Sequence, residues 1–285
     1  MALVSGNITT TQTAATGLTV LDMMVQQYLV ENAVLIPTIW DRTEALEQGA
    51  KSVDITRRSG FVAESKTEGS DYTAQSITWT ADTLTLDKQE GVYVQMTGKA
   101  RLQSAFDQES NITIASIEAL AEKLEGQVYT ALAAVAASSP DHKIAFQTTD
   151  TLSLSDINRA RLLLNKQKVP KDNNRFLAIN SDQEADLLDL EQFIHADKYG
   201  NSTALVNGEI GRIFGFRILV TENVTASTAL AYHRSHVAFC RQLGITFERD
   251  RNLQNDLDLY LMQTLYGIKT LDAGVRGVLL NNTGA

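Results

Sequence analysis

Two histidines and a cysteine lie close together in the sequence and could in principle do chemistry. His233 and His236 form an HxxH pair, and Cys240, the only cysteine, follows four residues later. Helical zinc sites space two histidines four residues apart and add a third ligand, whereas this pair lies in a segment that reads as loop into strand. Residues three apart on a strand face opposite sides. We therefore expect no metal site, and we expect Cys240 to be an inert buried thiol.

Two further patterns could mark a site. Gly208, Gly211 and Gly215 resemble a phosphate-binding loop, but a strand follows them, whereas a dinucleotide loop follows a strand and opens a helix. Asp186 and Asp189 could form a glycosidase-type acid pair, yet a solvated helix face explains them without one. We therefore expect turn glycines and surface acids, with no catalytic residue and no cofactor.

Composition restricts the class of protein further. The 285 residues are 44% hydrophobic, enough for one large or two modest cores. The net charge is −9, and no cluster of Lys and Arg suggests a surface dedicated to nucleic-acid binding. Neither a run of about 18 apolar residues nor a signal-peptide pattern occurs, so no membrane partner is expected. A single cysteine excludes an internal disulfide and fits a reducing cytosol.

A long amphipathic helix is predicted over about residues 107–137. Its apolar stripe recurs at steps of three and four: Ile117, Leu120, Ala121, Leu124, Val128, Leu132 and Val135. Its opposite face carries Glu118, Glu122, Lys123, Glu125 and Gln127. Because β-type periodicity precedes this helix and mixed α/β periodicity follows it, we expect it to join two bodies.

The segment before this helix is predicted to form an arm and then a β finger. The arm includes a helical pattern at residues 18–29. Between residues 50 and 97 the period is two, which predicts a strand leading out through Ile55, a polar tip around Gly69, and a strand returning through Met96. A lone hairpin is marginally stable in water, so another subunit is expected to cover this finger.

The segment after the helix alternates helices and strands. We predict a helix over residues 155–167, a strand over 175–179, and a second helix opened by a capping box of Ser181 and Glu184. Further strands are predicted at 216–220, 237–240, 245–247, 257–261 and 275–280. The tail is expected to return and pair with the β segment before the long helix.

Three stretches follow one another in a distinctive order: LDKQEGVYVQMTGKARLQSAF (residues 86–106), KVPKDNNRFLAIN (168–180) and NGEIGRIFGFRILVTENV (207–224). In type and order these stretches resemble parts of the major capsid proteins of tailed bacteriophages with the HK97 fold. They correspond to the strand before the spine helix, a helix-Pro-strand unit, and a glycine turn into a strand. Each is weak alone, and their order over nearly the whole chain makes the match specific.

The resemblance implies an α+β capsid fold divided into four regions. These are an N-arm (residues 1–48), an extended loop (49–97), a peripheral domain with the spine helix (98–140 and 245–285), and an apical α/β domain (141–244). Subunit contacts are expected at the loop residues Arg57, Arg58, Glu64, Lys66, Glu68, Asp71 and Trp79.

The function implied is that of a non-enzymatic coat protein. Copies of the chain would form pentamers and hexamers of an icosahedral head that encloses double-stranded DNA, with a portal, a separate scaffold and possible decoration proteins as partners. Such heads assemble in the bacterial host cytoplasm. Two alternatives stay open: an encapsulin-like cellular compartment, and a small α/β enzyme that uses His233, His236 or Cys240.

Overall fold

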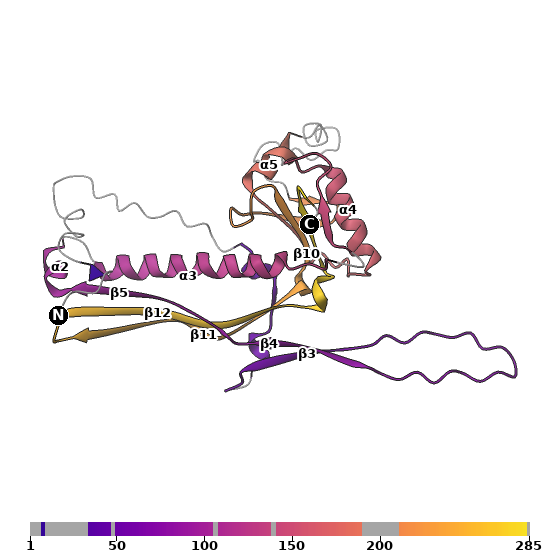
Figure 1. Cartoon of the computed structure of the whole chain (residues 1–285), viewed down its shortest axis with the longest axis horizontal. Helices are drawn as coiled ribbons and strands as arrows, with labels where there is room; N and C mark the ends of the chain where they lie inside the picture. Colours follow the sequence, from indigo (N-terminus) through magenta and orange to yellow (C-terminus); the bar gives the residue numbers. More distant parts are fainter. Residues whose placement is uncertain are drawn as a thin grey trace.

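A long helix beside an elongated sheet forms one part of the molecule, and a smaller sheet with two helices forms another (Figure 1). The computed structural model describes residues 7–8, 34–46, 49–104, 108–137, 141–189 and 211–283. The helix predicted at residues 18–29 and the predicted turn residue Gly208 lie outside these ranges. Within them, no helix is both long enough and apolar enough to span a bilayer.

The elongated sheet has five strands in the order β1-β5-β12-β11-β2. Its centre consists of β5 (Lys88–Thr97), β12 (Leu257–Thr270) and β11 (Val237–Asn252), all antiparallel. The short β1 (Asn7–Ile8) and β2 (Trp40–Asp41) add parallel edges. The predicted return of the tail is confirmed, because β12 pairs with β5 from Leu257↔Thr97 to Tyr266↔Lys88.

Residues 237–240 and 245–247, predicted as separate strands, belong to the single strand β11. Register shifts interrupt its ladder with β12 between Arg241 and Leu243 and between Leu243 and Thr246. Such irregularities shift the side-chain alternation, so the sequence pattern looks broken although the strand continues. The long opposing strand β12 holds both halves in one ladder.

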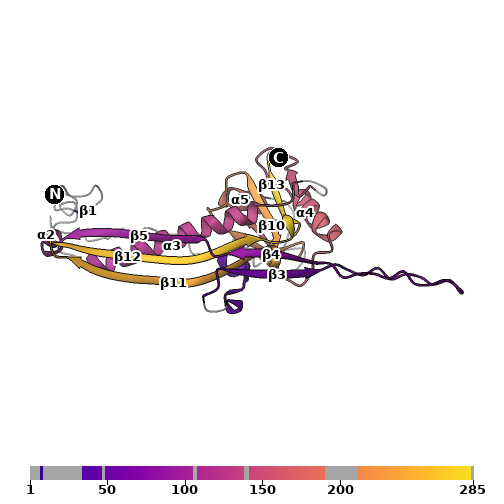
Figure 2. The ribbon, with the colours of Figure 1, turned by 60° about the horizontal axis from the view of Figure 1, so that its bottom comes forward.

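The long helix α3 (Gln108–Ala133) runs beside this sheet (Figures 1 and 2). It follows the short helix α2 (Gly98–Gln103), and at 1.5 Å per residue its 26 residues span about 39 Å. Most of the predicted apolar stripe is buried or half-buried, but Ile117 is exposed. The helix ends four residues before the predicted boundary at residue 137.

Glu125 contradicts the prediction of a solvent-facing polar side. Its side chain is 1% exposed, and its carboxylate accepts hydrogen bonds from the backbone N–H of Leu35 (3.0 and 3.2 Å) and of Ile36 (3.3 Å). These two amides precede and open the short 3-10 turn Ile36–Thr38 (η1), where N–H groups lack partners in their own turn. Glu125 therefore fixes the segment that crosses the helix, a role that helical periodicity cannot reveal.

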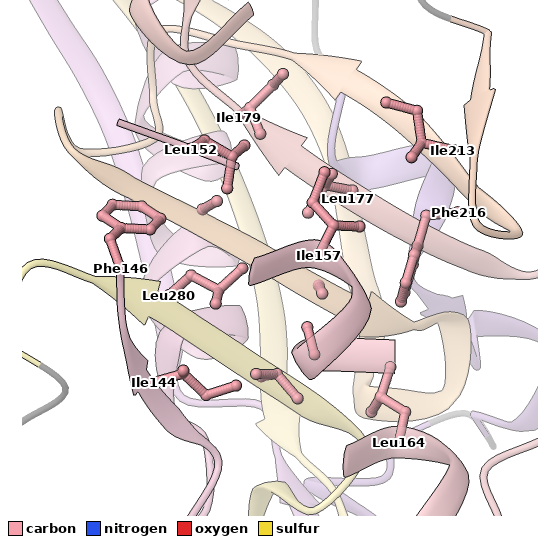
Figure 3. Close-up of a cluster of buried hydrophobic side chains, with 14 of the residues drawn as sticks. Ile144, Phe146, Leu152, Ile157, Leu164, Leu177, Ile179, Ile213, Phe216 and Leu280 are labelled. Carbon is pink, nitrogen blue, oxygen red and sulfur yellow. The ribbon is translucent and has the colours of Figure 1, made fainter. Parts of the chain in front are cut away.

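The second sheet has six strands in the order β6-β13-β10-β7-β9-β8. These strands are β6 (Lys143–Ala145), β7 (Arg175–Ile179), β8 (Arg212–Ile213), β9 (Phe216–Val220), β10 (Thr228–His233) and β13 (Gly277–Asn281). Figure 3 shows the apolar cluster between this sheet and helix α4, in which Ile157 and Leu164 face Leu177 and Leu280.

Two helices accompany the six-stranded sheet. Helix α4 (Leu154–Lys166) confirms the predicted helix within one residue at each end, and β7 confirms the predicted strand. Helix α5 (Ser181–Leu188) begins one residue later than expected. Its capping box is formed by Asn180 and Gln183, not by Ser181 and Glu184, because Asn180 has the extended backbone conformation that an N-cap requires.

The end of the chain joins the two sheets. After β12 the 3-10 turn Asp272–Gly274 (η5) leads to β13, which pairs with β10 and β6 in the six-stranded sheet. A further 3-10 turn, Arg234–His236 (η4), carries the chain from β10 into β11. An apolar cluster that includes Val128, Leu132 and Tyr232 fills the junction. The four regions predicted by residue number stay a prediction.

Candidate subunit interface

A finger extends away from both sheets (Figures 1 and 2). Its ladder is formed by β3 (Ser52–Arg58) and β4 (Trp79–Thr85), paired from Ser52↔Thr85 to Arg58↔Trp79. The sequence prediction carried the returning strand through Met96, but β5 leaves the finger and pairs with β12. Residues 59–78 continue beyond the ladder to a turn at Glu68 and Gly69. Gly69 has φ +86°, which suits glycine, so the predicted tip is confirmed.

Apolar packing holds the base of the finger against the elongated sheet. Ile55 and Leu84, one from each strand of the finger, are buried with Ala238, Cys240 and Leu271. Neighbouring Gly267 of β12 lies so close that a Cβ atom there would overlap the backbone oxygen of Thr85. The base is therefore fixed to the body, and it sets the direction in which the finger leaves.

Ion pairs reinforce this attachment. Arg57 contacts Asp82 at 3.1 Å on the opposite strand and also contacts Asp272 in η5. Asp272 in turn pairs with Arg276 at 3.3 Å, and its backbone N–H donates to Asp82 at 3.1 Å. Arg57, predicted to contact another subunit, therefore has carboxylate partners within its own chain. Its place at a subunit contact stays a prediction.

Side chains hold the two distal arms of the finger together. The Gln75 side chain donates to the Val62 carbonyl at 2.6 Å and accepts from the Val62 N–H at 2.9 Å. Of the predicted contact residues, Glu64 accepts from the Thr73 N–H at 3.2 Å, and Lys66 lies over the Tyr72 ring at 5.2 Å. These bonds join the arms where the ladder has ended.

The distal finger exposes apolar surface that no described part of its own chain covers. Every residue from 60 to 81 is exposed, including five large apolar residues: Phe61, Val62, Tyr72, Ile77 and Trp79. Single exposed apolar side chains are ordinary, but a group on one projecting segment marks a surface that another chain covers. Arg58, Glu68 and Asp71 are also exposed and form no ion pair with a described residue.

Sequence reasoning selected the charges and Trp79 of this finger but not the other four apolar residues as contact residues. The charged residues and Trp79 do lie on the projecting segment, so they are available to a neighbour. The other four apolar residues could have been selected from the sequence, because they are large apolar side chains in a polar stretch that offers little to pack against them. That signal becomes decisive only when the structure shows that none of the other described segments lies over them (Figure 2).

The residues considered for chemistry have separate structural roles. His233 bonds to Asp172 at 3.0 Å and to Ser235 at 2.7 Å, whereas the Nε2–H of His236 donates to the Leu132 carbonyl at 3.0 Å. Cys240 is buried at the finger base, and burial raises the pKa of its thiol. Among the described residues, no three His, Cys, Asp or Glu side chains gather as metal ligands.

His236 gives a testable pH dependence of stability. It is fully buried, and burial lowers its pKa from the usual 6.5 to about 4. The unfolded chain therefore binds a proton below pH 6.5 that the folded chain excludes, so the free energy of unfolding falls as pH drops from 6.5 toward 4. The loss should reach about 3 kcal/mol. Denaturant unfolding of native chain and His236→Gln at pH 7 and pH 4.5 should show a shallower loss in the variant, and parallel losses would contradict this assignment.

Comparison with known proteins agrees with this geometry. The family model described as phage capsid protein matches residues 20–268. Over 89 residues the chain is 28% identical to the major capsid protein of Escherichia phage T5, a match covering 30% of this chain and 19% of that relative. The match therefore spans about a fifth of that protein's length.

Solved capsid structures share the fold at low sequence identity. A structure from Mycobacterium phage Che8 has a TM-score of 0.75 and 22% identity, covering 94% of this chain and 99% of that chain. The capsid of the Cyanophage P-SCSP1u has a TM-score of 0.74 at 14% identity, covering 92% of each chain. The mature capsid of bacteriophage PhiM1 has a TM-score of 0.74 at 13% identity, covering 94% and 92%. The predicted HK97-like α+β fold is confirmed.

A helix laid along an elongated sheet, a second sheet and a projecting finger define the class of phage coat proteins. This chain belongs to the phage capsid protein family, whose model matches residues 20–268. It is therefore a structural component of a phage virion. The family match also favours a phage head over the encapsulin-like compartment that the sequence left open.

Proposed function

We propose that this chain is the repeating subunit of an icosahedral phage head that assembles as hexamers and pentamers around double-stranded DNA. The finger is the observation that carries the proposal. Its base is fixed to the body, whereas its distal half exposes five large apolar side chains that no described segment covers. A neighbouring copy would supply that cover.

Assembly would proceed through contacts that repeat from copy to copy. A finger that lies on the next subunit makes a head-to-tail contact, and such contacts close into rings when the rotation between copies closes. The fixed base keeps the finger ordered before contact, so less conformational freedom is lost on binding. The net charge of −9 suits a shell whose lining repels DNA of the same sign and lets it pack without adhering.

Several partners belong to this proposal. A portal would admit DNA, a separate scaffold would guide assembly in the bacterial host cytoplasm, and decoration proteins could bind the outer surface. DNA would be held by enclosure and not by sequence-specific recognition. The chain itself would contribute no catalytic step.

Electron microscopy of the purified full-length protein tests the class of assembly directly. The proposal expects symmetric particles, or hexamers and pentamers before closure. Limited proteolysis of dissociated protein should cut first within residues 59–78, because that segment is exposed in the single chain. A monomer whose finger resists protease at every concentration would contradict the proposal.

Reversal of Arg58 should impair assembly more than folding. Arg58 is exposed and has no ion pair with a described residue, so Arg58→Glu should change the free energy of unfolding by less than about 0.5 kcal/mol. Particle yield should fall about tenfold or more if the charge faces a neighbour. Lys66→Glu should act likewise, although it also removes the contact with Tyr72. Lys99→Glu, at an exposed position of α2, is the control. Equal losses of monomer stability and yield would count against a contact role.

A further inference from the structure

One end of the six-stranded sheet is strongly basic. Strands β7 and β9 are parallel, and Arg234 follows β10 beside Arg175, so several cations meet at the same end. They are Arg161, Lys171, Arg175, Arg212, Arg217 and Arg234, and they line two cavities of about 270 and 670 Å³. No described carboxylate lines either cavity. Nearby Asp172 is already bonded to His233 and Asn174.

At this end of the sheet, positively charged side chains lie close to one another. Arg212 and Arg217 lie directly opposite each other in the antiparallel β8–β9 pair, an arrangement that costs stability. Arg175 is buried and close to Arg161; burial lowers the pKa of Arg175, and the Arg161 charge lowers it further. Arg217 is exposed and forms no ion pair with a described residue. An external anion would relieve both repulsions.

The opposite end of the same sheet is acidic. Helix α5 begins where β7 ends and carries Asp182 and Glu184 in its first turn; Asp189 follows as its C-cap, and its last turn has no basic residue. Glu222, just beyond β9, bonds to Ser181 at the same end. Five residues of strand place this end about 16 Å from the basic end. The sheet therefore carries opposite charges at its two ends.

We propose that the basic end of this sheet receives the acidic end of the same sheet in a second copy, so that the sheets meet head to tail around a ring. This inference rests on the proposed shell function and names a contact within it. Opposite charges at opposite ends of one rigid sheet cannot pair within a chain. In a closed head-to-tail ring, the basic end of each copy contacts the acidic end of the next copy, so every charged end has one partner.

Two charge-reversed chains test the contact. One carries Arg212→Glu and Arg217→Glu, which keeps the like-charge pair but changes its sign. The other carries Glu184→Lys and Asp189→Lys and keeps Asp182 in the first helical turn, where a carboxylate suits the helix dipole. Each should keep its circular dichroism and melting temperature but lose about tenfold or more in ring and particle yield. Glu122→Lys with Lys123→Glu, exposed on α3, is the matched control.

Mixing the two variants gives the sharper result. In each variant the substituted end opposes the native end of an identical copy. The two substituted ends carry opposite charges at the changed positions and match each other, and the two native ends match each other, so the variants fit only in alternation. Alternation closes in rings with an even number of copies, so an equimolar mixture should recover hexamers but not pentamers by mass spectrometry and microscopy. Variants that assemble alone like the native chain, or a mixture without hexamers, would overturn this contact. Failure of the native chain itself to form rings would instead reject the shell function.

Discussion

Replacing residues 60–77 with an Asn-Gly turn is expected to abolish particle formation while leaving a folded monomer. Ser59 and Thr78 already pair through an N–H to carbonyl bond of 2.8 Å, so they can flank a two-residue hairpin turn. The removed residues are exposed, whereas Ile55 and Leu84 at the base stay in place. Sedimentation and electron microscopy should show particle yield reduced about a hundredfold or more, because the central apolar anchors of a contact are lost.

A second variant distinguishes the effect of shortening the finger from the effect of losing its apolar side chains. Phe61, Val62, Ile77 and Trp79 would be replaced together by serine in a finger of unchanged length. A similar loss of particles would assign the contact to these side chains, and Thr67→Ser at the tip is the control. If the shortened chain assembled with native yield, the finger would have no part in holding subunits together.

Glu125→Ala is expected to cause the largest loss of monomer stability, about 3 kcal/mol. The substitution removes the acceptor for the buried N–H of Leu35 and for the N–H of Ile36, and leaves a cavity beside α3. A charged acceptor contributes more than a neutral one, so Glu125→Gln should retain only part of the stability. Denaturant unfolding monitored by circular dichroism measures both differences.

Glu122→Ala provides the matched control for this prediction. Glu122 lies one turn earlier on the same helix and is exposed, so its removal should change the free energy of unfolding by less than about 0.5 kcal/mol. If both glutamates gave equal effects, the hydrogen bonds at Leu35 and Ile36 would contribute nothing measurable. An unchanged denaturant slope in all variants would show that the unfolded states are comparable.

Local sequence patterns were sufficient to predict the bounds of a helix or strand where one of its faces packs on neighbouring elements. The periods of α4 and β7 predicted their bounds closely, and the alternation at residues 257–261 correctly identified part of β12. The finger was recognised because its sequence offers little apolar mass to cover it. The charged contact candidates and Trp79 were selected because they belong to this finger, and their place at a subunit contact stays a prediction.

Other features needed contacts between residues far apart in the chain. Strand β5 was predicted to belong to the finger, but it pairs with β12 in the elongated sheet. Strand β13 pairs with β6 in the six-stranded sheet. Arg57 found carboxylates on β4 and η5, the second more than two hundred residues away in sequence. No periodicity contains such pairings, because they depend on which surfaces meet when the sheets pack.

The sequence by itself determined the long helix, helix α4, strand β7, the tip of the finger and the resemblance to the capsid family. Backbone propensity and side-chain periodicity act over a few residues, so these properties can be read along the chain. Tertiary structure alone decided that Glu125 is buried and that charges of opposite sign stand at opposite ends of one sheet. Burial and electrostatic fields depend on distances in space, and only the folded chain sets those distances.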